Sequence, residues 1–199
     1  MAAVQRGAGS AGSTNSPPQE DLHRTLGFQA GMSFLPPALI TAGHLVDSFD
    51  CGQESLNQYL KRFALTNTAA GTARTYVTTS SDETVVIGYY SLAAGSVEKA
   101  AVPERVAKGV PNYPIPVVLL ARLAIDQRFQ GKGLGTALLK DALARTLAAA
   151  DVVGVRAILV HAKGEEAARF YSQFGFTPSP TDPLHLMLLI KDLRRTLQA

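Results

Sequence analysis

Cysteine is almost absent from this sequence, and so is any long apolar run. One cysteine, Cys51, occurs in 199 residues, which excludes a framework of internal disulfides and is typical of a reducing compartment. No apolar stretch reaches the roughly 18 to 20 residues that a membrane-spanning helix needs. The N-terminal residues also lack the continuous apolar core of an export signal. We therefore expect a cytoplasmic protein that does not interact with membranes.

A strong charge of either sign is also missing. Lys and Arg number 19 against 16 Asp and Glu, a net charge of +3 that permits an anionic ligand without demanding one. Hydrophobic residues make up 46% of the chain, enough for the core of one ordinary domain. Residues 1–31 differ, because they are rich in Gly, Ser, Ala and Pro and show no helical or strand periodicity. We predict a flexible extension over 1–31 and a single domain over 32–199.

Hydrophobic periodicity predicts strands and helices in alternation. Leu56, Leu60 and Phe63 have helical spacing, and the proline-punctuated segment 103–116 is expected to be a loop. The predicted strands are 73–80, the first half of 84–100, 117–126, 155–161 and 185–190, and the predicted later helices are 135–149 and 164–174. A short polar turn separates the first two strands, which should form a hairpin. This order indicates one α/β or α+β domain built on a mixed sheet.

A glycine-rich junction within Ala121–Leu139 lies between a predicted strand and the helix after it. A helix N-terminus carries unpaired N–H groups and a partial positive charge, and glycine lets an anion reach that backbone because no Cβ intervenes. The spacing excludes a P-loop, which would need glycine where Asp126 stands, and a dinucleotide fingerprint, which would need it at Thr136. Arg128 and Lys132 add positive charge, so the junction predicts a phosphate-binding site.

The segment Arg128–Gly133 has the form R/Q-x-x-G-x-G/A, which resembles the motif that binds the coenzyme A pyrophosphate in the GNAT acetyltransferases. Its context adds to the resemblance, since LAID precedes the motif and EEAARFYSQFGF, Glu165–Phe176, looks like a later helix of that family. The resemblance implies the GNAT fold, a central mixed β-sheet flanked by helices, with acetyl-CoA as cosubstrate and no metal. A glycine-rich turn without a ligand is the alternative interpretation.

The resemblance also implies which residues bind the cosubstrate. The backbone of Leu123, Ala124 and Ile125 would pair with the pantetheine amides like an added strand. The N–H groups between Gln130 and Thr136 would bind the pyrophosphate. The loop residues assigned to cofactor binding are Arg128, Gln130, Gly131, Lys132, Gly133, Leu134, Gly135 and Thr136.

Tyr171 is the candidate proton donor to the departing thiolate. Tyrosine, with a pKa near 10, keeps its proton at neutral pH and can transfer it at short range. A purely structural aromatic, packed beside neighbouring phenylalanines, is the alternative. The sequence shows no convincing general base: Asp126 and Glu98 have no visible partner, and His161 ends a strand, where a structural role is favoured.

From about His44 to Leu193, the chain resembles a subgroup of the family: toxins of bacterial toxin–antitoxin modules that acetylate aminoacyl-tRNA and stop translation. The resemblance rests on FDCGQESLNQYL, GTARTYV, IGYYSLAAGSV, PIPVVLLARLAID and LVHAKGEEAARFYSQFGFTPSPTDPLHLMLLI. It implies aminoacyl-tRNA as substrate, a homodimer, and a ribbon-helix-helix antitoxin through which operator DNA is bound. The α-amino group of such a substrate, with a pKa near 8, is partly neutral at cellular pH and requires no strong base.

Basic residues gather between Leu56 and Gly135, where they would bind the phosphates of a tRNA acceptor stem. The predicted nucleic-acid-binding residues are Lys61, Arg62, Arg74, Arg105 and Lys108, each of which taken alone is compatible with a solvated surface charge. Two other functions remain open. One is acetylation of a small amine or a protein N-terminus at the same site, and the other is a non-catalytic module that binds coenzyme A or an antitoxin.

Overall fold

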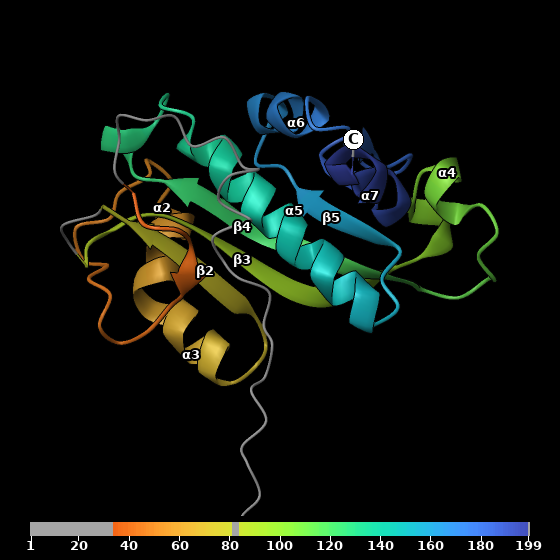
Figure 1. The fold of residues 1–199 in the computed structure, drawn as a ribbon. Coiled ribbons are helices and arrows are strands. Elements are labelled where there is room, and N and C mark those ends of the chain that lie inside the picture. The colour runs from red at the N-terminus through yellow and green to blue at the C-terminus, as the bar shows by residue number, and fades with distance from the viewer. Residues whose placement is uncertain (1–33, 81–83, 199) are drawn as a thin grey trace, which may run out of the picture.

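A seven-stranded mixed sheet with the order β1-β2-β3-β4-β5-β7-β6 lies at the centre of the molecule (Figure 1). The computed structural model describes residues 34–80 and 84–198, so the predicted extension 1–31 lies outside the described residues. The strands are β1 Ala38–Leu39, β2 Arg74–Thr79, β3 Val86–Val97, β4 Ile115–Ile125, β5 Ala157–His161, β6 Thr177–Pro178 and β7 His185–Leu189. β4 and β5 run parallel and the other neighbours antiparallel, which confirms the predicted mixed sheet.

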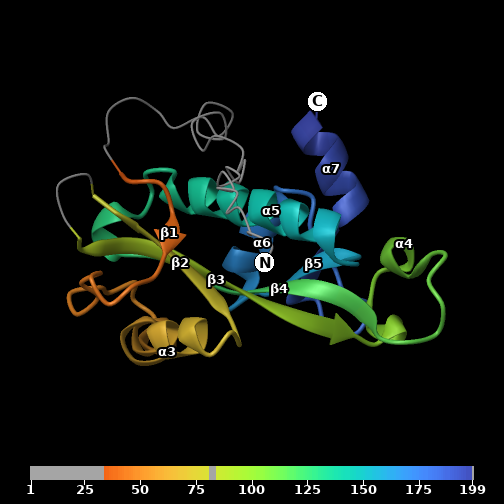
Figure 2. The ribbon, with the colours of Figure 1, turned by 60° about the horizontal axis from the view of Figure 1, so that its bottom comes forward.

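Helices cover both faces of this sheet (Figure 2). The described helices are α2 Glu54–Gln58, the π-helix η1 Tyr59–Phe63, α3 Ala64–Ala69, the 3-10 turns η2 Lys99–Ala101 and η3 Gln127–Phe129, α4 Glu104–Ala107, α5 Leu134–Val152, α6 Glu165–Ser172 and α7 Ile190–Gln198. The helices predicted over 135–149 and 164–174 are confirmed. The proline-punctuated segment does contain α4, but that helix is only 4 residues long, as proline spacing allows. No helix in the described ranges is both long and apolar enough to cross a membrane.

The two faces of the sheet have separate hydrophobic cores. On one face, Tyr59 and Leu60 of η1 pack against Val77 and Tyr89 of the strands. On the other face, the core contains residues of α5, α6 and α7 together with strand residues such as Leu120. The sheet is therefore buried on both sides, which explains why the sequence of β4 is a nearly continuous apolar run.

A β-bulge divides β4 into two halves. Ser91 of β3 pairs with Arg122, but the next residue, Leu92, pairs with Leu120, so Ala121 is an extra residue in β4. Up to Leu120 the even-numbered side chains of β4 face α5. After the bulge the odd-numbered side chains of Leu123 and Ile125 face α5 instead. The bulge therefore moves Arg122 to the face covered by η1, where its guanidinium lies 3.5 Å from the centroid of the Tyr59 ring.

Two contacts fix α5 on the sheet. Gly88 of β3 allows the helix to approach closely, since a Cβ there would lie 3.0 Å from side-chain carbons of Ile125 and Leu138. Further along the helix, Asp141 accepts a hydrogen bond from the buried Tyr90 hydroxyl and forms a 2.8 Å ion pair with Arg145. A buried carboxylate with such partners is satisfied, so the network fixes the direction of α5 and the position of its N-terminus.

Candidate active site

The loop between β4 and α5 exposes a row of backbone donors. Gly131 and Gly133 have φ values of 72° and 80°, in the left-handed region that favours glycine, and Gly133 is the N-cap of α5. Among the described residues, the backbone N–H groups from Gly131 to Thr136 have no hydrogen-bond partner. The first turn of α5 contains no acidic side chain. The loop therefore offers an acceptor-rich anion several free donors at the positive end of a 19-residue helix.

Next to this loop, β4 has an unpaired edge. Val117–Leu120 pair with β5, and beyond Leu120 the two strands share no further pairs in the described structure. The opposite edge of β4 stays paired with β3 as far as Ile125. Leu123, Ala124 and Ile125 thus present backbone groups to a gap between two parallel strands, where an extended molecule with amide groups can hydrogen-bond to them. The residues predicted to pair with the pantetheine amides thus lie on an open edge, which leads directly into the glycine loop.

Asp126, at the end of β4, holds the start of the loop. Its buried carboxylate accepts hydrogen bonds from the backbone N–H groups of Arg128 and Asp50, at 3.0 and 3.2 Å, and from the Arg128 guanidinium. Burial alone would raise the pKa of Asp126, but these hydrogen bonds outweigh it and lower the pKa below the ordinary value. Asp126, one of the two general-base candidates, is therefore a buried anion engaged in structure.

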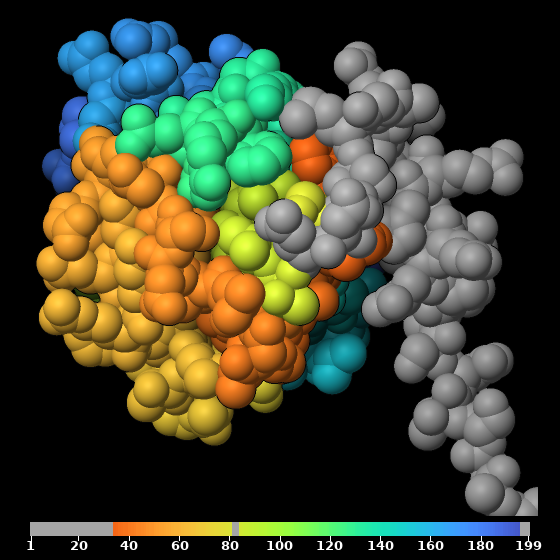
Figure 3. Space-filling view, turned by 90° about the vertical axis from the view of Figure 1, so that its left-hand side faces the viewer, coloured from red at the N-terminus to blue at the C-terminus, as the bar shows by residue number. Residues whose placement is uncertain are grey.

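The segment before α2 packs against the same loop, as the adjoining orange and green surfaces in Figure 3 show. Asp50 accepts hydrogen bonds from the backbone of Gly52 and from the side chains of Asn57 and Gln127, and its pKa is lowered by them, the Gly52 bond first. Gln130 donates to the carbonyl oxygens of Cys51 and Ile125, at 3.2 and 2.9 Å. Contacts with the segment that precedes α2 thus hold the β4–α5 loop, whose backbone N–H groups are exposed.

The two predicted phosphate-binding cations behave differently. Arg128 is bound to Asp126, although 59% of its side chain is exposed. Lys132 is exposed, with its ammonium 5.3 Å from the centroid of the Phe129 ring. Lys132 is therefore able to turn toward an anion in the loop. The charge of Arg128 is already paired with the Asp126 carboxylate.

Tyr171 lies in the core between α6 and the sheet. Its side chain is 7% exposed, and its ring contacts those of Phe170 and Phe176. No hydrogen-bond partner for its hydroxyl is found in the described residues, and burial raises its pKa to about 12. This environment accommodates both the packing role and the proton-donor role that the sequence left open.

The two remaining acid–base candidates are His161, the last residue of β5, and Glu98. His161 stacks on His185 at a centroid distance of 3.9 Å, and burial and that second ring lower its pKa. Glu98 is exposed at the far end of β3. In residues 34–80 and 84–198, no group of three or more His, Cys, Asp and Glu side chains is arranged to hold a metal ion.

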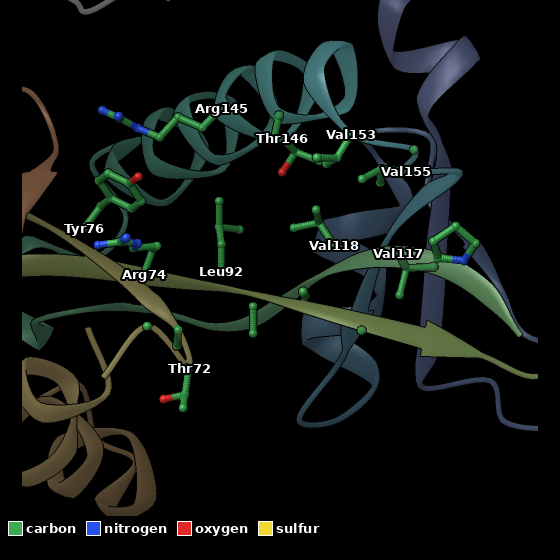
Figure 4. Close-up of a pocket in the computed structure, with 18 residues that line it drawn as sticks. Thr72, Arg74, Tyr76, Leu92, Val117, Val118, Arg145, Thr146, Val153 and Val155 are labelled. Carbon is green, nitrogen blue, oxygen red and sulfur yellow. The ribbon is translucent and has the colours of Figure 1, made fainter. Parts of the chain in front are cut away.

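The five predicted nucleic-acid-binding residues do not form one patch. Lys61 and Arg62 are exposed on η1, and Arg105 and Lys108 lie on and beside α4, at the other end of the sheet in Figure 1. Arg105 is also paired with Asp192 of α7 at 2.6 Å. Arg74 lines a mainly apolar groove of about 380 Å³ between α5 and strands β2 to β4, near Tyr76 and Arg145 (Figure 4).

The acetyltransferase (GNAT) domain model matches residues 72–178, the part of the chain that contains the unpaired edge and the glycine loop. The chain belongs to the GNAT acetyltransferase family. The tRNA-acetylating toxin of Mycobacterium tuberculosis is 51% identical over 158 residues, which are 79% of this chain and 93% of that protein. The probable toxin TacT of Sinorhizobium fredii is 33% identical over 155 residues, 74% of this chain and 86% of its own.

Solved structures give the same fold. AtaT complexed with acetyl-methionyl-tRNAfMet superposes with a TM-score of 0.76 at 31% identity, covering 82% of this chain and 99% of AtaT. A tyrosine-to-phenylalanine variant of KacT superposes with a TM-score of 0.77 at 28% identity, covering 82% of this chain and 99% of KacT. The GNAT fold predicted from the glycine motif is thereby confirmed.

Proposed function

We propose that this enzyme transfers the acetyl group of acetyl-CoA to the α-amino group of aminoacyl-tRNA and thereby blocks translation as the toxin of a toxin–antitoxin module. The observation that carries the proposal is the pairing pattern of β4, whose edge is open from Ala121 to Ile125 and leads into a loop with free N–H groups. The extended pantetheine chain suits the edge, and the diphosphate suits the loop.

Each part of the site has one task in this reaction. Leu123–Ile125 hold the acyl carrier by backbone hydrogen bonds, and the donors from Gly131 to Thr136, with Lys132, bind its diphosphate. The amine attacks the thioester carbonyl, its nitrogen loses one proton to solvent, and the carbon–sulfur bond then breaks to release a thiolate. Backbone N–H groups next to the bulge can stabilise negative charge on the carbonyl oxygen, because the extra residue of a bulge lies outside the regular ladder.

In this proposal Tyr171 donates a hydrogen bond to the departing thiolate. With a pKa of about 12, its hydroxyl keeps its proton throughout the physiological range. A thiol has a pKa nearer 8.5, so hydrogen-bond donation to the developing thiolate is more favourable than complete proton transfer. The α-amino nucleophile is partly neutral at cellular pH, so the reaction does not require Asp126, Glu98 or His161 as a base.

The choice of acceptor is supported by the relatives. The curated relative that is 51% identical is a tRNA-acetylating toxin, and AtaT has been solved with acetyl-methionyl-tRNAfMet. AtaT with its antitoxin AtaR has also been solved with acetyl-CoA and with DNA. We propose charged tRNA in the cytoplasm and an antitoxin as partners of this chain. From the family resemblance we also propose that the antitoxin is of the ribbon-helix-helix type and carries the operator contact, and that a second copy of the chain completes a homodimer. The proposed acetyltransferase unit spans 32–199, since the sheet extends beyond the matched region on both sides.

Labelled acetyl-CoA incubated separately with charged tRNA, uncharged tRNA, free amines and peptides with free N-termini tests the proposal. Label on the aminoacyl end of charged tRNA alone is the expected result. Label on free amines or protein N-termini with none on charged tRNA would establish the rival substrate class. Binding of acetyl-CoA without transfer to any acceptor would instead establish a non-catalytic module.

A further inference from the structure

An arginine beside the open edge of β4 has no counter-ion within residues 34–80 and 84–198. Arg122 follows the bulge directly and precedes Leu123, the first residue of the edge that we assign to the acyl carrier. Its side chain lies on the face covered by η1 and is half-buried. No carboxylate lies within ion-pair distance of it in the described part of the chain, and no hydrogen bond of its guanidinium is found there. Its guanidinium N–H groups are therefore available to an anion that a ligand supplies.

The guanidinium is nevertheless held in one place. Its central carbon lies 3.5 Å from the centroid of the Tyr59 ring, so the cation is stacked on the face of the aromatic ring. Tyr59 is 3% exposed, and its hydroxyl is hydrogen-bonded to Ser91 at 3.0 Å and to Thr75 at 3.2 Å. Stacking occupies the flat face of the guanidinium and leaves the N–H donors around its edge for a planar or tetrahedral anion.

Two irregular segments meet at this contact. Tyr59 is the first residue of the π-helix η1, and Arg122 adjoins the bulge in β4. Both are local departures from regular structure of the kind that re-aims side chains at binding sites. Their combined effect is to present a preorganised cation beside the position where the acetyl group would be transferred.

The diphosphate of the acyl carrier is not the anion that suits this position. Its loop begins beyond Ile125, three strand residues or about 10 Å farther along β4. The anion must therefore come with the acceptor. In an aminoacyl-tRNA, the phosphate nearest to the reactive amine is the one attached to the 5′ carbon of the terminal adenosine. Resting on the proposed function, we infer that Arg122 binds this terminal phosphate and so positions the aminoacyl ester at the open edge.

The test compares two small acceptors that differ in this phosphate alone: the 3′-aminoacyl esters of adenosine and of adenosine 5′-monophosphate. Both carry the amino acid that the charged-tRNA experiment identifies. The wild type should use the phosphorylated ester about tenfold more efficiently in kcat/KM, mainly through KM. Arg122→Gln should reduce that ratio to about one and leave the affinity for acetyl-CoA unchanged. Lys191→Gln removes an exposed cation elsewhere and should preserve the ratio.

Arg122→Lys gives a second measurement if loss of the stacked arginine unfolds η1. It keeps the charge but loses the planar donor edge, so the ratio should fall partly. A phosphate preference as large as that of the wild type in either folded variant, or one that is missing from the wild type while charged tRNA is acetylated, would overturn this inference and leave the proposed function intact. Failure of the wild type to acetylate charged tRNA would overturn the proposed function, and the inference with it.

Discussion

Arg128 and Asp126 form a two-pronged ion pair at the end of β4, in which Nε and Nη2 donate to Oδ1 and Oδ2 at 2.8 and 2.9 Å. One partner of the ion pair is buried and the other is exposed: the Asp126 side chain is 2% exposed and that of Arg128 is 59% exposed. Its importance therefore lies in the buried hydrogen bonds that hold the loop more than in the exposed charge.

Asp126→Asn should loosen the loop and weaken the binding of acetyl-CoA. We expect the dissociation constant to rise about tenfold and the free energy of unfolding to fall by about 1 to 3 kcal/mol. Calorimetry and chemical denaturation measure the two effects. Asp151→Asn is the matched control, because its ion pair with Arg194 is exposed on both sides and should contribute little. Equal behaviour of the two variants would contradict a structural role for Asp126 in the loop.

The acid sensitivity of the fold should depend on the same carboxylates. The pKa values of Asp126 and Asp50 are lower in the folded protein than the unfolded value of about 3.9, because hydrogen bonds favour their charged forms. Their stabilisation is complete above the unfolded pKa and is lost as the pH falls through the folded pKa. Denaturation curves between pH 7 and pH 3 should show a decline below about pH 4 that is shallower in Asp126→Asn. Identical declines would exclude Asp126 as a contributor.

Gly133→Ala separates backbone strain from obstruction of the site. At Gly133 φ is 80°, and an added Cβ would meet nothing within 4 Å, so the cost to folding is conformational, about 1 to 2 kcal/mol. Gly109 has a φ of 74° and equally open surroundings, but it lies far from the loop in sequence, beyond α4. Both alanine variants should lose similar stability, while only Gly133→Ala should bind acetyl-CoA more weakly, by about tenfold or more. Calorimetry showing equal affinities would remove the loop from the binding site.

Tyr171→Phe distinguishes catalysis from packing. Since the hydroxyl has no hydrogen-bond partner in the described residues and its oxygen is not fully buried, its loss should change the free energy of unfolding by less than about 0.5 kcal/mol. A proton donor should instead be revealed by a fall in kcat of about 100-fold with the affinity for acetyl-CoA preserved. Steady-state kinetics with charged tRNA provide the measurement, and near-normal kcat would assign Tyr171 to the core alone.

The separation of the basic residues predicts unequal roles in tRNA binding. Lys61 and Arg62 lie on η1, the helix that also carries the aromatic partner of Arg122. Replacing both by Gln should weaken charged-tRNA binding and reduce the slope of log K against log salt by about 1.5. Arg105→Gln, at the other end of the sheet, should change neither by much because Arg105 is paired with Asp192. Equal losses would mean that the acceptor stem spans both ends.

The fold was largely predictable because its main strands and helices are long enough to show a period. Apolar runs of strand length located β3 and β4, and helical periodicity after the glycines located α5. β1 and β6 were not predicted, since each is 2 residues long and exists only through pairing with a neighbour. The π-helix was also missed, because propensity distinguishes helix from strand but not one hydrogen-bonding register from another.

The site was predictable where it depends on adjacent residues and not where it depends on distant ones. The glycine spacing indicated the loop, and the resemblance to the GNAT family implied a role for the backbone of β4 that precedes it. The hydrogen bond that joins Asp126 to Asp50 links residues 76 positions apart, and no local pattern reports such a contact. Arg122 was counted only as one basic residue among several, because its orientation depends on the extra residue in β4. A resemblance to a family located the chemistry, but the contacts that support it required the structure.

The extra residue at Ala121 has an unusual consequence for how this strand tolerates shortening. Deleting it would restore an uninterrupted ladder with β3, a change that ordinarily makes a sheet more regular. Every side chain from Arg122 to Asp126 would then point to the opposite face of the sheet. The Arg122 guanidinium would enter the hydrophobic core beneath α5, and Leu123 and Ile125 would face η1. A more regular strand would thus make the folded protein less stable. The bulge lets the two halves of β4 place different side chains in the core and at the ligand site.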